Sequence, residues 1–306
     1  MLHPAHTGPR VRVIVNTDAK NEADDQFAIV HAALTPSFDL VGVSAAHYGD
    51  KKHPESMLES RKEIELLVRL MGDDGARMPL SNGAPHALPD AHTPVPSEAS
   101  ELIIREALRD DTDLPLYISF FGPLTDMASA ILEAPEIADR PITVLWIGGG
   151  PYPAGGPEYN LSNDITAANV VFDSAVEVWQ IPQDVYRLMA VGYAEMKLRV
   201  APYGDLGRYL VDQVIEYNAR TRPVRWEYRS WGDSPAVGLI LNPFAGQSEW
   251  RPAPNFRNDM TYEHRDTDRL VRVFTSVDQR YILEDFFSKL RLWHEGDLFG
   301  YPEDQE

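Results

Sequence analysis

Residues 11–26 read VRVIVNTDAKNEADDQ, and this stretch sets the frame for the whole chain. The apolar run Val11–Val15 has the length of a buried strand, and four carboxylates follow it closely: Asp18, Glu22, Asp24 and Asp25. Open α/β sheets bind their ligands at the carboxyl ends of their strands. Hard cations such as Ca²⁺ and Mg²⁺ require oxygen ligands of this kind. The stretch therefore predicts a cation site where a first strand gives way to a helix.

Apolar, β-branched runs alternate with helical patterns over the first part of the chain. The expected strands are Val11–Val15, Leu40–Ala45, Leu116–Phe120, Ile142–Ile147 and Val176–Ile181. The expected helices are Asp24–Leu34, Pro54–Met71, Ser97–Leu108, Leu124–Leu132 and Thr166–Phe172. This alternation predicts an α/β fold with an open, mostly parallel central sheet flanked by helices, a Rossmann-like core.

The pattern changes after about residue 190, where helical runs predominate. They cover Gly204–Tyr217, Pro235–Leu241 and Val277–Trp293, which predicts a helical C-terminal third. Asn242–Arg265 is expected to be an extended loop or edge hairpin, and Pro79–Pro96 a loop. We expect residues 1–306 to form one domain.

Composition excludes several classes of protein. The chain has 306 residues and a formal net charge of −19, which disfavours a nucleic-acid polymer or an anionic membrane as partner. It has no cysteine, so disulfides, thiolate nucleophiles and sulfur-ligated metals are excluded. No apolar run has the length of a membrane span, and the first residues lack a signal-peptide core. We therefore expect a cytoplasmic protein that acts on a small molecule.

The acidic stretch also has an ordinary explanation. Acidic residues in the first turn of a helix complement its dipole, and Asp is a favoured N-cap, so Asp24 and Asp25 alone need no ligand. Asp18 lies at the carboxyl end of the expected strand, in the turn where capping needs no second acidic group. Crowding it against the other carboxylates is unfavourable unless a cation or a raised pKa relieves the repulsion. A metal shared by Asp18 and Asp25 is the favoured interpretation.

The spelling of this stretch resembles the N-terminal motif Asp-Thr-Asp-Pro-Gly-x-Asp-Asp of the inosine–uridine preferring nucleoside hydrolase family. Here Asn16 stands for the first Asp, and two extra residues separate Asp18 from Asp24. Later segments resemble other motifs of this family, in the family's order. They are Gly122–Ala128, Ile147–Gly150, Glu158–Asn160 with Asn163-Asp164, and Gly232–Ala236. Each alone could be a turn, a loop or a helix cap; their order favours a divergent, nucleoside-hydrolase-like member.

The resemblance implies a set of roles for matching positions. Asp18, Asp25, Asp233 and the backbone carbonyl of Phe121 would hold Ca²⁺. Asp18 would also be the general base that activates the attacking water. The expected substrate-binding residues are Asp24, Glu158, Asn160, Asp233 and His47, the last because it follows the second strand. The implied reaction is hydrolysis of the N-glycosidic bond of a ribosyl compound, which releases a base and ribose, as in nucleobase salvage. Relatives form dimers or tetramers, so we expect a homo-oligomer.

One departure affects the chemistry. The family places a His before its late Asp, often cast as the acid that protonates the leaving group, and here that position is Gly232. Hydrolysis of a different glycoside, or binding of a sugar or nucleoside without catalysis, therefore stay open as alternatives. An Asp-x-Asp phosphatase of the haloacid-dehalogenase type fits less well, because position 16 is Asn.

Aromatic residues surround the late motif. Trp226, Tyr228, Trp231, Trp250 and Tyr262 could stack on a nucleobase or a sugar face, or they could pack in the core or at an interface.

Overall fold

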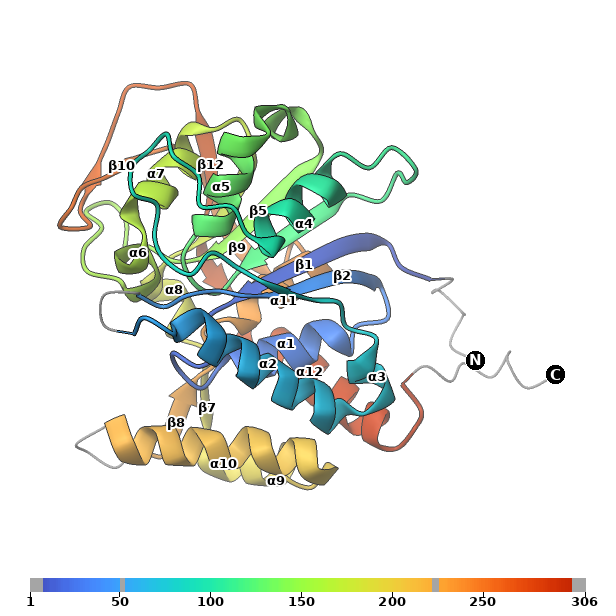
Figure 1. The fold of residues 1–306 in the computed structure, drawn as a ribbon. Helices are drawn as coiled ribbons and strands as arrows, with labels where there is room; N and C mark the ends of the chain where they lie inside the picture. Colours follow the sequence, from blue (N-terminus) through green and yellow to red (C-terminus); the bar gives the residue numbers. More distant parts are fainter. Residues whose placement is uncertain (1–7, 50–52, 222–225, 299–306) are drawn as a thin grey trace.

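The computed structural model describes residues 8–49, 53–221 and 226–298. Its centre is an eight-stranded sheet in the order β3-β2-β1-β4-β5-β6-β12-β9 (Figure 1). In chain order these strands are β1 (Val11–Thr17), β2 (Phe38–Ala45), β3 (Leu80–Asn82), β4 (Leu116–Phe120), β5 (Ile142–Ile147), β6 (Glu177–Ile181), β9 (Gly246–Pro252) and β12 (Leu270–Val277). Neighbours pair in parallel except β9, which is antiparallel to β12. The predicted α/β fold is confirmed.

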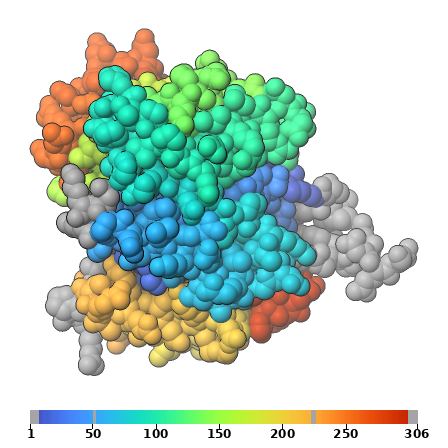
Figure 2. Space-filling view, in the orientation of Figure 1, coloured from blue at the N-terminus to red at the C-terminus, as the bar shows by residue number. Residues whose placement is uncertain are grey.

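Helices cover both faces of the sheet (Figure 1). The core on one face is formed with α1 (Asp25–Ala33), α2 (Ser56–Met71), α9 (Tyr193–Arg199), α10 (Gly204–Thr221), α11 (Ser234–Leu241) and α12 (Gln279–His294). The core on the other face is formed with α4 (Glu98–Ala107), α5 (Thr125–Glu133) and α7 (Ile165–Asp173). Helix α10 is the outer layer on its side and lies beside α2, as the space-filling view also shows (Figure 2).

Strand β1 is buried because its side chains serve both cores. Val13 and Val15 pack into the core that includes α1, whereas Ile14 packs into the opposite core. A parallel strand covered on both faces reads as a near-continuous apolar run, and in Val11–Val15 only Arg12 interrupts it. The acidic stretch follows at the carboxyl end of β1. Its side chains therefore lie at the end of the sheet where the parallel strands terminate.

The C-terminal third contains the expected helices and also contributes two strands, of which β12 was not expected. It adds β12 and β9 to the central sheet. β9 lies within the predicted edge segment Asn242–Arg265 and is an edge strand whose residues are mostly exposed, so it carries no apolar alternation. The proline-rich segment Pro79–Pro96 begins with β3, the other edge strand. Short, polar edge strands give the weakest sequence signal because half of their contacts are with water.

Short elements complete the described part of the chain. They are α3 (Asp73–Ala76), a 3₁₀ turn (Pro135–Asp139), α6 (Tyr159–Asn163), α8 (Gln183–Tyr186), the pair β7 (Ala190–Gly192) and β8 (Tyr228–Ser230), and the pair β10 (Asn255–Phe256) and β11 (Tyr262–Glu263). Across these described ranges, no helix combines the length and apolar character needed to cross a bilayer.

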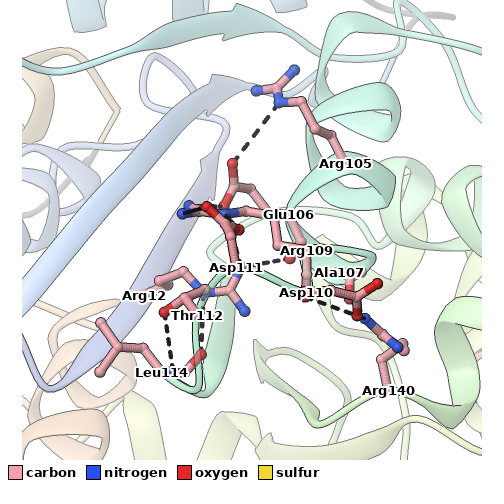
Figure 3. A network of polar contacts seen from close by, with 10 residues as sticks. All are labelled: Arg12, Arg105, Glu106, Ala107, Arg109, Asp110, Asp111, Thr112, Leu114 and Arg140. Atoms are coloured by element: carbon pink, nitrogen blue, oxygen red, sulfur yellow. Dashed lines mark hydrogen bonds and ion pairs between the residues drawn. The ribbon is translucent and has the colours of Figure 1, made fainter.

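A buried arginine lies at the opposite end of the sheet, where the parallel strands begin (Figure 3). Arg12 on β1 donates through Nε to the carbonyl of Leu114 at 3.1 Å. Its Nη1 donates to the backbone carbonyl of Glu106 at 2.5 Å and to Glu106 Oε2 at 3.2 Å. The side chains of Arg12 and Glu106 are 4% and 9% exposed. These contacts tie β1 to the last turn of α4 and to the segment before β4, remote from the acidic stretch.

We expect Arg12→Ala to lower the free energy of unfolding by about 3 kcal/mol. The substitution leaves two carbonyls without this donor, and the buried Glu106 carboxylate keeps only its contacts with the more exposed Arg105 and Arg109. Urea unfolding at neutral pH measures this change. The matched control is Arg105→Ala, whose side chain is 66% exposed and lies 3.8 Å from the same carboxylate. It should cost under about 1 kcal/mol. Equal losses for the two variants would contradict the assignment.

Candidate active site

Two strand ends build the floor of the site. Asp18 follows β1 and Phe121 follows β4, and these strands pair so that Asn16 lies opposite Phe120. Gly122 lets the two segments approach, because a Cβ there would lie 2.9 Å from Asp18 Cγ. Asp18 is 1% exposed, and its Oδ2 is buried without a hydrogen-bond partner. A buried carboxylate oxygen with no donor is a costly arrangement that a cation would relieve.

Three further carboxylates converge beside it. Asp24 is the N-cap of α1, Asp25 is its first residue and Asp233 is the N-cap of α11. Each offers one oxygen, and these oxygens lie within 4.8 Å of one another. Thr17 donates to Asp25 Oδ1 at 2.5 Å, which fixes that side chain. The two helix starts thus place acidic groups from positions more than 200 residues apart in one cluster.

The cluster is electrostatically strained in the absence of a cation. Burial raises the pKa of Asp25 to about 8, and the charge of Asp24 adds to this shift. Burial, followed by the charge of Asp25, raises the pKa of both Asp18 and Asp233 well above the ordinary range of an aspartate. Desolvation and like charge both penalise the ionised form. A divalent cation would reverse this penalty.

Asp24 is held differently from its neighbours. Its Oδ1 accepts from Arg229 Nη2 at 3.2 Å, and its Oδ2 accepts from the Gly232 backbone N–H at 2.8 Å. Arg229 is 5% exposed and also pairs with Glu22 of the acidic stretch. Both Asp24 oxygens are therefore oriented by protein donors. This arrangement fits an acceptor for substrate hydroxyls, the role predicted for Asp24.

Glu158 is the most heavily bonded of the predicted residues. Its carboxylate accepts from the backbone N–H groups of Gly149, Asn160 and Leu161 and from the hydroxyl of Tyr186, at 2.8–3.2 Å. Burial raises its pKa, and these hydrogen bonds oppose the shift. The side chain caps α6 and fixes the loop that carries Asn160.

Asn160 binds the strand ends directly. Its Nδ2 donates to the carbonyls of Phe121 at 2.7 Å and Ile147 at 2.8 Å. This use of Nδ2 leaves the amide oxygen as the group that can accept a hydrogen bond from a ligand. The Phe121 carbonyl, predicted as a backbone ligand of the cation, keeps a second lone pair.

These groups line one small cavity, here called the acidic cavity, at the carboxyl ends of β1, β4 and β5. Its volume is about 50 Å³. Seven of the predicted site residues line it: Asp18, Asp24, Asp25, Phe121, Glu158, Asn160 and Asp233. The structure therefore brings together a set that the sequence scatters over more than 200 positions.

His47 is the exception. It is buried, and its Nε2 lies 2.9 Å from the hydroxyl of Thr125, which itself donates to Asp164. The Gly49 backbone N–H lies 3.3 Å from the other ring nitrogen, Nδ1. Both nitrogens therefore serve hydrogen bonds within the protein, and His47 is not among the residues of the described chain that line the acidic cavity.

The aromatic residues near the late motif divide into two groups. Trp231 is fully buried and stacks on Phe27 at 3.8 Å between ring centroids, and Tyr262 is buried and donates to the Gly150 carbonyl. Trp250 lies on the exposed edge strand β9. Trp226 and Tyr228 line a second cavity beside the acidic one. Packing thus accounts for Trp231 and Tyr262, whereas Trp226 and Tyr228 line a cavity with partly exposed rings.

Two residues of the site carried no signal in the sequence. Tyr186 ends the four-residue helix α8 and lines both cavities. Arg229 lies on β8 and pairs across the site with Glu22 and Asp24. Neither belongs to a motif, so only the fold reveals their position. An excess of acidic groups that need a cationic partner was the one available hint for Arg229.

The donor set fits a hard divalent cation. It consists of carboxylate oxygens with a backbone carbonyl nearby, and Asp18 Oδ2 lacks a partner. Oxygen ligands of this type suit Ca²⁺, Mg²⁺ or Mn²⁺, and the set contains no sulfur or imidazole.

Comparison with known proteins gives a consistent result. The model of the family described as inosine-uridine preferring nucleoside hydrolase matches residues 13–282. A pyrimidine-specific ribonucleoside hydrolase of Escherichia coli O157:H7 is 23% identical over 264 residues, which cover 76% of this chain and 79% of that protein. An uncharacterized protein of Schizosaccharomyces pombe is 26% identical over 199 residues, and the match spans 57% of this chain and 62% of the yeast protein's length.

Solved structures share the fold. A purine-preferring ribonucleoside hydrolase from Gardnerella vaginalis superposes with a TM-score of 0.74 at 21% identity, over 93% of this chain and 99% of that one. A plant nucleoside hydrolase superposes with a TM-score of 0.72 at 18% identity, over 92% and 99% of the two chains. The chain therefore belongs to the inosine-uridine preferring nucleoside hydrolase family, whose members are enzymes that act on N-glycosyl compounds.

Proposed function

We propose that this protein hydrolyses the N-glycosidic bond of a ribosyl compound in a Ca²⁺-dependent reaction. The observation that carries the proposal is the convergence of Asp18, Asp24, Asp25 and Asp233 with Glu158 and Asn160 around one cavity. A bound cation would lower the pKa of a water molecule and attract sugar hydroxyls. Its holders would be Asp18, Asp25, Asp233 and the Phe121 carbonyl.

Each side chain of the site then has a separate role. Asp18 Oδ2 has no other partner, so it is the group free to take the proton of the attacking water. A well-placed general base typically contributes ~10²–10⁴-fold to the rate. Asp24 is oriented by Arg229 and Gly232 to accept from a ribose hydroxyl. The Asn160 amide, fixed through its nitrogen, presents its oxygen to the sugar.

The proposal is tested with a panel of ribosyl compounds, by measuring free base and reducing sugar together. We expect equal amounts of base and ribose. Each deoxyribosyl counterpart should react more slowly, by on the order of 10⁴-fold in kcat/KM, because a missing hydroxyl leaves buried polar groups unpaired. Sites that hydrogen-bond a substrate hydroxyl discriminate far more than about tenfold against the analogue that lacks it. A ratio of ribosyl to deoxyribosyl kcat/KM below about ten would therefore contradict the sugar-binding roles. Binding without any product would favour the non-catalytic alternative.

A further inference from the structure

A hairpin from the C-terminal quarter of the chain packs against the loop that joins β5 to α6. The hairpin consists of β10, β11 and the turn between them. The Gly156 N–H donates to the Met260 carbonyl at 2.9 Å, and the Tyr262 N–H donates to the Ala154 carbonyl at 3.0 Å. An isolated antiparallel bridge also joins the two segments. The hairpin therefore pairs with the loop much as a neighbouring strand would, and it fixes where the loop lies.

Tyr262 and Gln180 hold the glycine turn, Gly148–Gly150, with which this loop begins. The Tyr262 hydroxyl donates to the Gly150 carbonyl at 2.7 Å. Gln180 Nε2 donates to the Gly148 carbonyl and to the Tyr262 hydroxyl oxygen, both at 3.0 Å. Gly149 has a φ of +82°, and a Cβ there would lie 2.4 Å from both Gln180 Nε2 and the Tyr262 hydroxyl oxygen. The glycine turn thus packs directly against two buried polar side chains.

Glu158 is held by the glycine turn. The Gly149 N–H donates to Glu158 Oε2 at 2.9 Å, and the Leu161 N–H donates to the same oxygen at 2.8 Å. Oε1 accepts from the Asn160 N–H at 3.2 Å and from the Tyr186 hydroxyl at 2.8 Å. A carboxylate has about four acceptor positions. These four protein donors use them all, so Glu158 serves to fix the loop and has no acceptor position left for a sugar hydroxyl.

Asn160 connects Glu158 to the ends of the strands. Its backbone N–H donates to Glu158, and its Nδ2 donates to the carbonyls of Phe121 at 2.7 Å and Ile147 at 2.8 Å. The amide oxygen of Asn160 is the group left to meet a ligand. A displacement of Glu158 would therefore move both this oxygen and the donor that the Phe121 carbonyl accepts from.

Met260 has a strained backbone at the point where the hairpin meets Glu158. Its φ is +65°, and it is the one residue other than glycine with a positive φ in the described ranges. A left-handed conformation is unfavourable for a residue that carries a Cβ. The Met260 Sδ accepts from the Glu158 N–H at 3.4 Å. Strain of this kind persists where surrounding contacts impose it, and it is concentrated near functional sites.

We propose that Tyr262 and Gln180 are positioning residues for sugar binding, which act on the substrate through Glu158 and Asn160. Neither is among the residues of the described chain that line the acidic cavity, so their effect on the sugar is indirect. This inference rests on the proposed function and deepens it, because it names the residues that set the position of the sugar-binding amide. Loss of the Tyr262 hydroxyl should accordingly raise KM more than it lowers kcat.

The test is a double-mutant cycle of Tyr262→Phe and Asn160→Ala, measured as KM and kcat/KM for release of ribose from the preferred ribosyl substrate. Tyr262→Phe removes only the hydroxyl and keeps the ring, which packs on Tyr152 and Phe256. We expect it to lower kcat/KM by on the order of tenfold, since a small misplacement of a binding group can cost up to about 10²-fold. In the Asn160→Ala protein the same change should cost less than about twofold, because effects within one hydrogen-bond network are not additive.

Two further variants complete the cycle. Gln180→Met removes the other donor to the glycine turn, and it should lower kcat/KM in the wild-type protein and have little effect in Asn160→Ala. Arg257→Ala is the matched control, because this side chain lies in the turn of the same hairpin and is 55% exposed, paired only with the exposed Glu263. It should retain the kcat/KM of the wild-type protein.

The failure of this inference is distinct from the failure of the proposed function. Losses from Tyr262→Phe and Asn160→Ala that simply multiply would overturn the inference and leave the proposed function standing. A Tyr262→Phe variant with a lower Tm but wild-type KM and kcat/KM would show a purely structural role and would overturn it equally. If the wild-type protein released no ribose from any compound of the panel, the proposed function would be refuted, and this inference with it.

Discussion

Replacing Asp18 by Asn is expected to lower kcat by about 10²–10⁴-fold, the contribution of a general base. The amide keeps the shape that fits against Gly122, but it cannot accept the proton of the attacking water. Steady-state kinetics with the best substrate of the panel measures the loss. The control is Asp139→Asn, a substitution of an exposed aspartate on the 3₁₀ turn, which should retain full activity.

The same substitution should not weaken the fold. Burial and the charges of Asp25, Glu22 and Asp24 all raise the pKa of Asp18, so its ionised form destabilises the native state. A neutral amide removes that repulsion. Thermal unfolding without divalent cations should give an equal or higher Tm for Asp18→Asn. An Asp18→Asn variant that is inactive because it unfolds would contradict the assignment. So would a variant that keeps more than about a tenth of the wild-type activity, because a general base contributes at least about 10²-fold.

Stability without divalent cations should fall as the pH rises. Asp25 has a pKa of about 8 in the folded chain against an ordinary 3.8, and the pKa values of Asp18 and Asp233 are raised as well. The native state therefore binds more protons than the unfolded state between these values. The contribution of these three groups to stability is greatest below the ordinary pKa and is lost as the pH rises toward the folded pKa. Tm should thus decline between about pH 4 and pH 8, the span of the two Asp25 values.

Ca²⁺ should reverse this decline. At a concentration of 100 times its Kd, a ligand that binds only the native state stabilises it by about 2.7 kcal/mol. The gain should be largest near pH 8, where the carboxylates would otherwise repel one another. Thermal unfolding with and without Ca²⁺ measures it, and Asp25→Asn and Asp233→Asn should each lose most of the gain. A pH-independent Tm without cation, or equal Ca²⁺ effects in these variants, would count against the cluster as the cation site.

The sequence predicted the strands and helices whose apolar residues follow a clear pattern. Val11–Val15 was recognisable as a strand because both faces of β1 are buried. The helices α2 and α10 carry a buried apolar stripe, whereas α1 is buried on nearly all sides. β3 was missed, and β9 was anticipated only as part of an extended loop or edge hairpin, because edge strands tolerate polar residues. β12 was missed because only three of its eight residues are buried, so the helical runs around it dominated the pattern.

The site was predictable where chemistry is encoded in ordered motifs. Asp18 is an acidic residue at a strand end, and Asp25 and Asp233 lie at helix starts. The fold brings these positions together at the carboxyl ends of the parallel strands. The alternative of simple helix capping is insufficient, because Asp233 makes no side-chain capping bond and Asp18 Oδ2 has no partner. His47 also follows a strand, yet its ring bonds to Thr125 instead of facing the cavity, and sequence position does not encode side-chain direction.

The same cation-depleted protein gives the most direct test of the central claim, that these buried carboxylates form one cation-dependent hydrolytic site. Release of ribose from the preferred ribosyl substrate is measured after chelation and again after Ca²⁺ is restored. The account predicts that activity disappears on chelation and returns with Ca²⁺ in the wild-type protein but stays absent in Asp18→Asn. Full activity in the presence of the chelator, or undiminished activity of Asp18→Asn, would contradict it.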